Sequence, residues 1–297
     1  MPATDQLTEE FEARRGHLRA VAYRMLGSTT EADDALQEAW LRVSRAGADG
    51  VNNVGGWLTT VVGRVCLDML RSRRARREEP LGPVMPEPLV STRDGGDPEH
   101  EALLADSVGL ALFVVLETLN PGERLAFVLH DMFGVPFDEI APIVGRSPAA
   151  ARQMASRARR RVQGEVPPVD PDIAEQQRVV DAFLAAAREG DFEALVEVLD
   201  PDVVLRADAG ALALAGPREV RGVDAVLEQV VRFRQAAANA RTVLVNGAPG
   251  FVVIRDGAPA GVAGFTVSGG RIVAMDMLLD PQRLAALDLS AAGVPRP

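Results

Sequence analysis

The chain has 297 residues, 47% of them hydrophobic and 25% charged, and its formal net charge at pH 7 is −10. This length predicts two or three domains, and this composition is ordinary for a soluble globular protein. The longest apolar run, Val108–Leu116, is much shorter than the ~20 residues of a membrane-spanning helix. Cys66 is the only cysteine, which excludes an internal disulfide, and no signal segment is evident, so we expect a protein of the reducing cytoplasm. Because the overall charge is negative, any surface for nucleic acid must be a local patch.

Residues 8–77 read as an all-helical unit. Apolar residues recur at helical period up to Gly27, and a second helix is predicted over Glu31–Val43. A loop rich in glycine and asparagine, Gly47–Gly56, separates it from a third helix that ends in the arginine tract Arg71–Arg77. Prolines and glycines then form a linker, Pro80–Pro98, that cannot be helical. The next helix is predicted over Glu99–Leu119, with Asp97 and Pro98 at its start.

The stretch from Asn120 to Gln163 indicates a helix-turn-helix. Asn120 and Pro121 predict an N-cap and first helical residue, and a short helix follows from Pro136 to its end at Gly145. Ser147 and Pro148 then begin a last helix. Between Arg146 and Arg161 there are six arginines and no acidic residue. This concentration of positive charge predicts phosphate binding, whereas the alternative is a solvated arginine face.

A second linker, Gly164–Pro171, precedes a region of mixed pattern. Helices are predicted over 173–188, 192–199 and 223–235, and strands over 203–206, 242–245, 251–255, 261–267 and 271–279. Turn pairs such as Asn246-Gly247 and Asp256-Gly257 separate the last four strands. This order of elements predicts a compact α+β domain.

Two segments of the first unit carry candidate binding residues. EADDALQEAWLRV, residues 31–43, forms an acidic amphipathic helix, which taken alone indicates only a domain surface. Asn52, Asn53 and Trp57 lie at a loop-to-helix junction ahead of the arginine tract. Such a loop can hold an extruded base while arginines follow the backbone; the alternative is that Trp57 is a core anchor.

These segments resemble a known family. Residues 1–78, residues 8–78 most clearly, look like domain 2, and 99–164 like domain 4, of the extracytoplasmic-function sigma factors of bacterial RNA polymerase. The matching pieces are ADDALQEAWLRV, GGWLTTVVGRVCLDMLRSRRAR and LNPGERLAFVLHDMFGVPFDEIAPIVGRSPAAARQMASRARRRV. The resemblance implies a polymerase subunit with a linker at 79–98, and not an enzyme.

The resemblance also implies roles for individual residues, with core RNA polymerase (β′ clamp helices and β flap) and promoter DNA as partners. The residues that would face the β′ clamp helices are Asp33, Asp34, Gln37, Glu38 and Leu41. Those that would capture the −10 element and hold the backbone nearby are Asn52, Asn53, Trp57, Arg71, Arg73 and Arg74. Those that would read the −35 element are Arg152, Gln153, Ser156 and Arg157, with Arg159, Arg160 and Arg161 on phosphates.

After a linker at 165–171, residues 172–297 resemble the cone-shaped SnoaL-like domain, of the NTF2 or cystatin-like fold, that one sigma group carries in place of a separate anti-sigma partner. The segments PLGPVMPEP, VLRADAG and DPQRL carry this resemblance. The last corresponds to a tail motif usually written Asn-Pro-Asp-Lys-Leu and differs from it at three of five positions; its residues are Asp280, Pro281, Arg283 and Leu284 besides Gln282. The linker also lacks the aromatic residues of the family pattern, and alanines interrupt the glycine run after Asp208.

Polar candidates for a pocket in this SnoaL-like domain are Arg206, Asp208, Arg255 and Asp276. Asp276 lies between Met275 and Met277, so alternation turns it either inward or outward. A buried carboxylate there can bind a ligand cation or act as a base, and the alternative is a structural salt bridge with Arg206. All three histidines, at 17, 100 and 130, precede the domain, which disfavours catalysis. No spacing predicts a metal site, and no cofactor is expected.

The sequence thus predicts a multidomain chain, with two all-α sigma domains followed by an α+β domain that regulates promoter-directed initiation. An unidentified small-molecule ligand of the α+β domain is a further candidate partner. Two alternatives remain open at this point. One is a ligand-sensing helix-turn-helix regulator without polymerase; the other is a SnoaL-like enzyme fused to a DNA-binding module.

Overall fold

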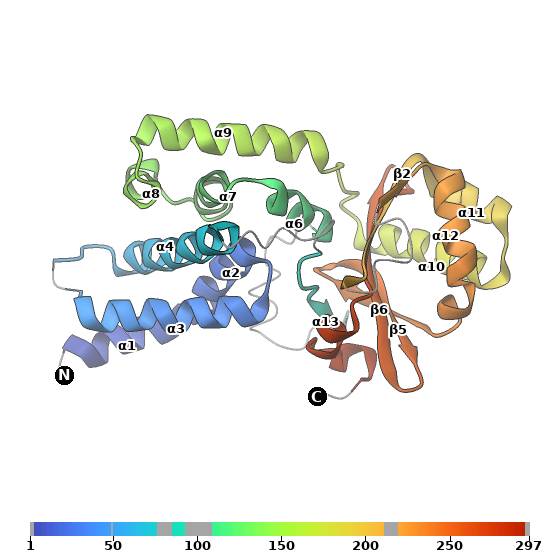
Figure 1. Cartoon of the computed structure of the whole chain (residues 1–297), viewed down its shortest axis with the longest axis horizontal. Coiled ribbons are helices and arrows are strands. Elements are labelled where there is room, and N and C mark those ends of the chain that lie inside the picture. The colour runs from blue at the N-terminus through green and yellow to red at the C-terminus, as the bar shows by residue number, and fades with distance from the viewer. Residues whose placement is uncertain (1–2, 49, 76–84, 93–108, 211–218, 295–297) are drawn as a thin grey trace. The chain divides into compact units, whose positions relative to one another are not determined.

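The computed structural model describes residues 3–48, 50–75, 85–92, 109–210 and 219–294 (Figure 1). The chain divides into two compact units. The sigma unit comprises Met1–Glu79 and Val115–Glu165, and the sheet unit comprises Pro80–Val114 and Val166–Pro297. No helix in the described residues is both long and apolar enough to cross a membrane.

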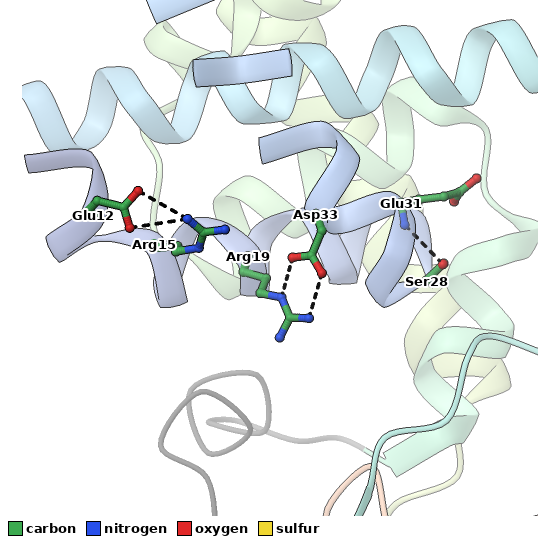
Figure 2. A network of polar contacts seen from close by, with 6 residues as sticks. All are labelled: Glu12, Arg15, Arg19, Ser28, Glu31 and Asp33. Carbon is green, nitrogen blue, oxygen red and sulfur yellow. Dashed lines mark hydrogen bonds and ion pairs between the residues drawn. The ribbon is translucent and has the colours of Figure 1, made fainter. Parts of the chain in front are cut away.

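Four helices form the first part of the sigma unit: α1 (Ala3–Ala13), α2 (Arg15–Leu26), α3 (Thr29–Ala46) and α4 (Val54–Ala75). Gly27 ends α2 in the left-handed conformation, with φ of 72°. The Ser28 hydroxyl then caps α3 by accepting a hydrogen bond from the Glu31 backbone N–H at 3.4 Å (Figure 2). Helix α4 begins at Val54, within the loop predicted to extend to Gly56.

The helix-turn-helix follows the predicted pattern closely. Helix α6 (Gly109–Thr118) precedes it. Its own elements are α7 (Pro121–Phe127), a π-helical turn (Val128–Met132), α8 (Phe137–Val144) and α9 (Pro148–Glu165). The Asn120 side chain caps α7 by accepting from the Glu123 N–H at 2.9 Å. Gly145 ends α8 at φ of 67°, the left-handed position that glycine occupies at little cost. Residues 93–108, which hold most of the helix predicted from Glu99, lie outside the described residues.

Helix α4 packs against both α7 and α8 within the sigma unit. Gly63 permits the close approach, since a Cβ there would lie 3.0 Å from the Leu129 side chain. Arg124 on α7 is 2% exposed, donates to the Arg24 carbonyl at 3.3 and 3.4 Å, and pairs with Glu117 at 2.7 Å. A buried charge with these partners ties the helix-turn-helix to the end of α2.

The sheet unit is built on a seven-stranded sheet in the order β1-β4-β5-β6-β7-β2-β3. Its strands are β1 (Val90–Ser91), β2 (Leu199–Asp208), β3 (Glu219–Arg221), β4 (Ala240–Val245), β5 (Ala248–Arg255), β6 (Ala258–Ser268) and β7 (Arg271–Leu278). Only the β2–β7 pair is parallel. Asn246 and Asp256, both at φ of 51°, and the glycines after them make the hairpin turns that the sequence predicted.

Different segments cover the two faces of the sheet. Helices α10 (Ile173–Glu189), α11 (Phe192–Val198) and α12 (Val223–Ala237) pack on one face, around Phe183, Phe251 and Phe265 (Figure 1). The other face carries a smaller apolar cluster that includes Met85, Val90, Leu110 and Leu284. The last of these lies on α13 (Pro281–Ala285), ahead of a 3-10 turn (Ser290–Ala292).

The predicted α+β architecture is therefore present, with two strands that the sequence did not predict. Strand β1 comes from the segment predicted as an open linker, and β3 is three residues long. Both are too short to show an alternating pattern, so only their pairing with β4 and β2 identifies them.

Candidate functional site

One face of α3 is exposed along its length. Asp34, Gln37, Glu38 and Leu41 lie on this face, spaced so that they share one side of a helix. Leu41 is 47% exposed, although the opposite side of the helix is buried by Ala32, Ala35, Leu36, Ala39 and Val43. Four of the five predicted polymerase-facing residues thus share one exposed face, with Asp34 and Glu38 as its acids.

Ion pairs hold two of the acids predicted to face the polymerase. Asp33 is half-buried and accepts two hydrogen bonds from the Arg19 guanidinium, at 2.7 and 3.0 Å (Figure 2). Glu38 accepts from Arg42 at 2.9 Å, and Arg42 also pairs with Asp68 at 3.1 Å. The bidentate pair orients Asp33 towards α2, so this residue is less free than Asp34 to meet a partner.

The loop before α4 presents amides beside a half-buried tryptophan. Asn52 and Asn53 are exposed, and the Asn53 side chain accepts from the Gly56 N–H at 3.0 Å. Asn53 therefore closes the first turn of α4, a structural role beside the predicted one. Trp57 is partly exposed at the same turn.

The arginine tract at the other end of α4 points in two directions. Arg71 and Arg74 are exposed, whereas Arg73 is half-buried and forms an ion pair with Glu31 at the start of α3. Residues 76 and 77 lie outside the described part. Of the three predicted backbone contacts, Arg71 and Arg74 are thus the accessible ones.

Helix α9 buries an alanine face and exposes a polar one. Ala151, Ala155 and Ala158 are fully buried. The predicted DNA-reading residues on the remaining surface are Arg152, Gln153 and Arg157, all exposed, and Ser156, which is half-buried. The Arg152 guanidinium lies over the Phe137 ring, 5.3 Å from its centroid, an arrangement that orients the side chain.

Acidic residues from neighbouring elements reach several of these arginines. Arg157 donates to Glu123 of α7 at 2.7 Å, and Arg159 donates to Asp131 of the π-helical turn at 2.6 Å. Arg161 pairs with Glu165 within α9. Arg160 is exposed and donates weakly to the Ser156 carbonyl at 3.4 Å. The cluster that is free of acids in the sequence is partly neutralised in the fold.

In the sheet unit, Asp208 joins the linker to the tail motif. Its carboxylate accepts from the Met85 N–H at 3.0 Å and from Arg283 at 2.5 Å, and Arg283 also donates to the Met85 carbonyl. Asp280 caps α13 by accepting from the Gln282 N–H at 2.8 Å, with Pro281 as the first helical residue. One hydrogen-bonded junction therefore joins Met85 of the linker, Asp208 of β2 and Arg283 of the tail motif. We call it the linker junction.

Arg206 and Asp276 form the salt bridge that the sequence offered as one of two readings. They are paired in register on β2 and β7, with 2.8 Å between the guanidinium and the carboxylate. Met275 and Met277 pack in the helix-covered core, so Asp276 lies on the opposite face. Asp276 is 1% exposed, and burial raises the pKa of its carboxyl while Arg206 opposes that rise.

Two other residues considered in the sequence, Arg255 and Cys66, lie apart from this pair. Arg255 is exposed at the end of β5 and joins neither Asp276 nor the linker junction. Cys66 is buried, and desolvation raises the pKa of its thiol to about 12, in agreement with a core role. Among the described residues, no group of three or more histidines, cysteines or acids could hold a metal ion.

Sequence reasoning missed Asn246 as part of the site. Its amide is 1% exposed, and it exchanges hydrogen bonds with the linker: its side chain accepts from the Leu89 N–H at 3.1 Å, and its own N–H donates to the Leu89 carbonyl at 2.8 Å. The Asn-Gly pair indicated only a hairpin turn. Nothing local in the sequence signals that a residue 157 positions away binds there.

The comparisons with known proteins agree with this organisation. A family model described as Sigma-70 region 2 matches residues 11–76, and one described as Sigma-70, region 4 matches residues 110–162. The chain is 40% identical over 296 residues to the ECF RNA polymerase sigma factor SigJ of Mycobacterium tuberculosis, covering 94% of each chain. It is 34% identical over 303 residues to the probable ECF sigma factor SigI of the same organism, covering 99% of this chain and 100% of the relative.

A solved structure extends the likeness to the whole fold. The crystal structure of Mycobacterium tuberculosis SigJ matches with a TM-score of 0.77 and 38% identity, covering 95% of this chain and 99% of that one. A polymerase-independent regulator does not account for identity over 94% and 100% of the length of these two sigma factors. The chain therefore belongs to the extracytoplasmic-function sigma factors of RNA polymerase, as its three motifs indicated.

Proposed function

We propose that this sigma factor uses α3, the start of α4 and α9 as its contacts with polymerase and promoter, and that its SnoaL-like domain regulates it through the linker junction. Membership of the family implies binding to core RNA polymerase and promoter DNA, which places its action in the cytoplasm with that enzyme. The assignment of single residues is our proposal.

The exposed face of α3 is the proposed surface for the β′ clamp helices. Leu41 supports it, because a leucine left 47% exposed beside acids gives a partner both apolar area and charge to complement. Asp34, Gln37 and Glu38 surround it. Asp33 acts indirectly in this proposal, since Arg19 already holds its carboxylate. The β flap is a second proposed polymerase contact, for which no residue is assigned.

Asn52 and Trp57 are the proposed contacts with the −10 element. Exposed amides and a partly exposed aromatic ring offer hydrogen bonds and a stacking surface to an unstacked base. Asn53 fixes the turn that presents them. Arg71 and Arg74 would hold phosphates, and Arg73 contributes less because Glu31 pairs with it.

Helix α9 is the proposed reader of the −35 element. Arg152 and Gln153 are exposed and carry the side chains that form paired hydrogen bonds with guanine and adenine. Arg157 would exchange Glu123 for DNA, while Ser156 lies at the edge of this surface. Arg159 and Arg160 are proposed phosphate contacts.

One observation carries the regulatory proposal: the linker between the two sigma regions is bound into the sheet of the SnoaL-like domain. Strand β1 pairs with β4, Asn246 binds Leu89, and the linker junction holds Met85. Anchoring these residues limits how far the chain on either side of the linker can extend. We infer that the anchored linker restrains initiation and that its release permits it.

The same contacts argue against a catalytic role for the domain. The Asp276 carboxylate is paired with Arg206 and the Asp208 carboxylate with Arg283. The domain also has no histidine to serve as a base. A small-molecule ligand would regulate the protein only by binding more tightly to the anchored or to the released arrangement.

In vitro transcription with core polymerase and the full-length chain tests the regulatory proposal. Arg283→Gln removes the ion pair with Asp208 and the bond to the Met85 carbonyl, so we expect more run-off transcript at limiting sigma concentration. Arg178→Gln is the matched control, because its side chain is 73% exposed and pairs only with Glu175 among the described acids. Equal or lower output from Arg283→Gln than from the control would contradict the restraining role.

A further inference from the structure

The sigma unit contains a pocket that the proposed polymerase and promoter contacts do not explain. It has a volume of about 410 Å³ and lies between the end of α4, the start of α7, the turn after α8, and α9. All of its lining residues belong to the one compact sigma unit. This volume lies within the range of about 300–1,000 Å³ that small-molecule sites occupy.

Three arginines line the pocket. Arg71 and Arg74 are three residues apart on α4 and so share a face, and Arg146 follows the left-handed Gly145 at the end of α8. All three are exposed. Arg73, between the first two, turns instead to Glu31. The end of α4 therefore directs two of its three arginines, Arg71 and Arg74, to this pocket.

Among the residues that the structure describes, no acid offsets these charges. The pocket has no aspartate or glutamate among its described lining residues, and no ion pair within the described residues involves Arg71, Arg74 or Arg146. The arginines of α9 differ, because Glu123 and Asp131 reach Arg157 and Arg159. Three like charges around one cavity favour an anion of more than one negative charge.

The remaining wall is mostly apolar. Val144, Met154 and Pro121 line it, and Asn120 is its one polar residue among the described lining residues. Met154 lies close to α7, and a Cβ at Gly122 would lie 2.6 Å from the Met154 Cε, so that the flexible end of this side chain would have to shift. The pocket thus offers guanidinium groups to phosphates and an apolar surface to an attached ring or chain.

We propose that this pocket binds a small molecule that carries a diphosphate group. The three guanidinium groups bind the phosphate oxygens, and the wall of Val144 and Met154 contacts the group that the diphosphate carries. Inorganic diphosphate and a nucleoside diphosphate share this chemistry. Binding itself does not depend on the proposed promoter contacts.

The effect of this ligand on promoter binding rests on the proposed function. Arg71 and Arg74 are also proposed to hold the promoter backbone, so an occupied pocket would compete with DNA for them. The ligand would also bridge α4 and the helix-turn-helix across the pocket.

Isothermal titration calorimetry on the full-length chain at physiological salt tests the proposal, with sodium pyrophosphate and ADP as probes and sulfate at equal ionic strength as reference. We expect one site for each phosphate probe and none for sulfate. Arg146→Gln should weaken binding roughly 10-fold, the effect of losing one charged hydrogen-bonding group. Arg161→Gln removes the same charge from the exposed end of α9, outside the pocket, and should change affinity less than roughly twofold.

A second variant, with a measurement of folding beside it, distinguishes loss of the site from misfolding. Met154→Glu places an acid in the apolar wall and should abolish binding of both probes, while tryptophan fluorescence reports whether the sigma unit remains folded. Tighter binding of ADP than of pyrophosphate would identify a nucleotide as the ligand. Tighter binding of pyrophosphate would identify inorganic diphosphate, and either result supports the site.

Three results would overturn the proposal. The first is no heat from either probe with the unaltered chain, and the second is equal weakening by Arg146→Gln and Arg161→Gln. The third is binding of a short DNA duplex that depends on Arg146 when neither probe binds, which would make the pocket part of the DNA surface. None of these would affect the restraint test at Arg283, so failure here and failure of the proposed function are distinguishable.

Discussion

Helix α9 in the sigma unit and the strand pair β2–β7 in the sheet unit both carry arginines paired with acids, but in opposite surroundings. On α9, Arg157 is 52% exposed and pairs with Glu123 at the surface. On the sheet, Arg206 is 13% and Asp276 only 1% exposed. An exposed pair exchanges its partner for DNA or water at little cost, whereas a buried pair cannot separate without leaving a desolvated charge.

The difference separates the charges that serve binding from those that serve structure. Substitutions on the exposed surfaces should change binding and leave stability nearly intact. Substitutions at the buried pairs should do the reverse. Both tryptophans of the chain, Trp40 and Trp57, lie in the sigma unit, so their fluorescence follows that unit alone.

The largest effect is expected at the buried sheet pair. Arg206→Met leaves the Asp276 carboxylate without its partner and should lower the free energy of unfolding by about 3–5 kcal/mol. Urea unfolding followed by far-ultraviolet circular dichroism measures this, and the fluorescence transition should not move. A shift in the fluorescence transition of equal size would show that the two units do not unfold separately.

The loss at Arg206 should depend on pH. The pKa of Asp276 lies above its ordinary value of 3.8, so the folded state holds this proton more tightly than the unfolded chain does. Its contribution to stability therefore falls as pH rises from that value through the folded pKa. Removing Arg206 raises the pKa further, so the destabilisation should be greatest at neutral pH and shrink on acidification. A pH-independent loss would contradict this account.

The buried arginine of the sigma unit should come next. Arg124→Met removes the bonds to the Arg24 carbonyl and the pair with Glu117, and should cost about 2–3 kcal/mol. The cost is smaller than at Arg206 because Glu117 is 24% exposed and can regain water. Here the fluorescence transition, which follows the sigma unit, should shift to lower urea concentration. The part of the dichroism transition that comes from the sheet unit should keep its midpoint. No change would show that Arg124 does not hold the helix-turn-helix to α2.

On α9 the expected loss is in DNA affinity. Arg152→Ala should weaken binding of the holoenzyme to its cognate promoter roughly 10-fold and relax preference at one base pair of the −35 element. Arg160→Ala should instead weaken binding to all sequences. It should also reduce the slope of log affinity against log salt concentration by about one. Electrophoretic mobility shifts over a salt series distinguish the two. Equal behaviour of both variants would remove the assignment of Arg152 to base reading.

The smallest effect is expected at the apolar centre of the α3 surface. Leu41→Ala should weaken core polymerase binding by severalfold, because only the exposed 47% of the leucine can be buried by a partner. Val196→Ala is the control, since Val196 is 45% exposed but lies on α11 of the sheet unit. Pull-down of core polymerase measures both. Equal retention of polymerase by the two variants would exclude Leu41 from the interface.

Much of this protein follows from local pattern. Capping residues, glycines and helical periodicity predicted α3, α4 and α7–α9 to within a few residues, because each signal acts within one or two turns. The hairpin turns at Asn246 and Asp256 were equally local, and the family motifs lie within single continuous segments. Alternation left open whether Asp276 points inward or outward, and the sequence only named Arg206 as one candidate partner.

Tertiary structure decided which charges meet. The pairing of Arg157 with Glu123, of Arg73 with Glu31, and of Asp208 with Arg283 joins residues far apart along the chain, and no periodicity reports such distances. The linker was the largest difference: proline and glycine excluded a helix, but only the free edge of β4 made residues 90 and 91 a strand. Hydrogen bonding to a sheet edge depends on what lies beside a segment in space, so the short sequence of the linker carried no sign of it.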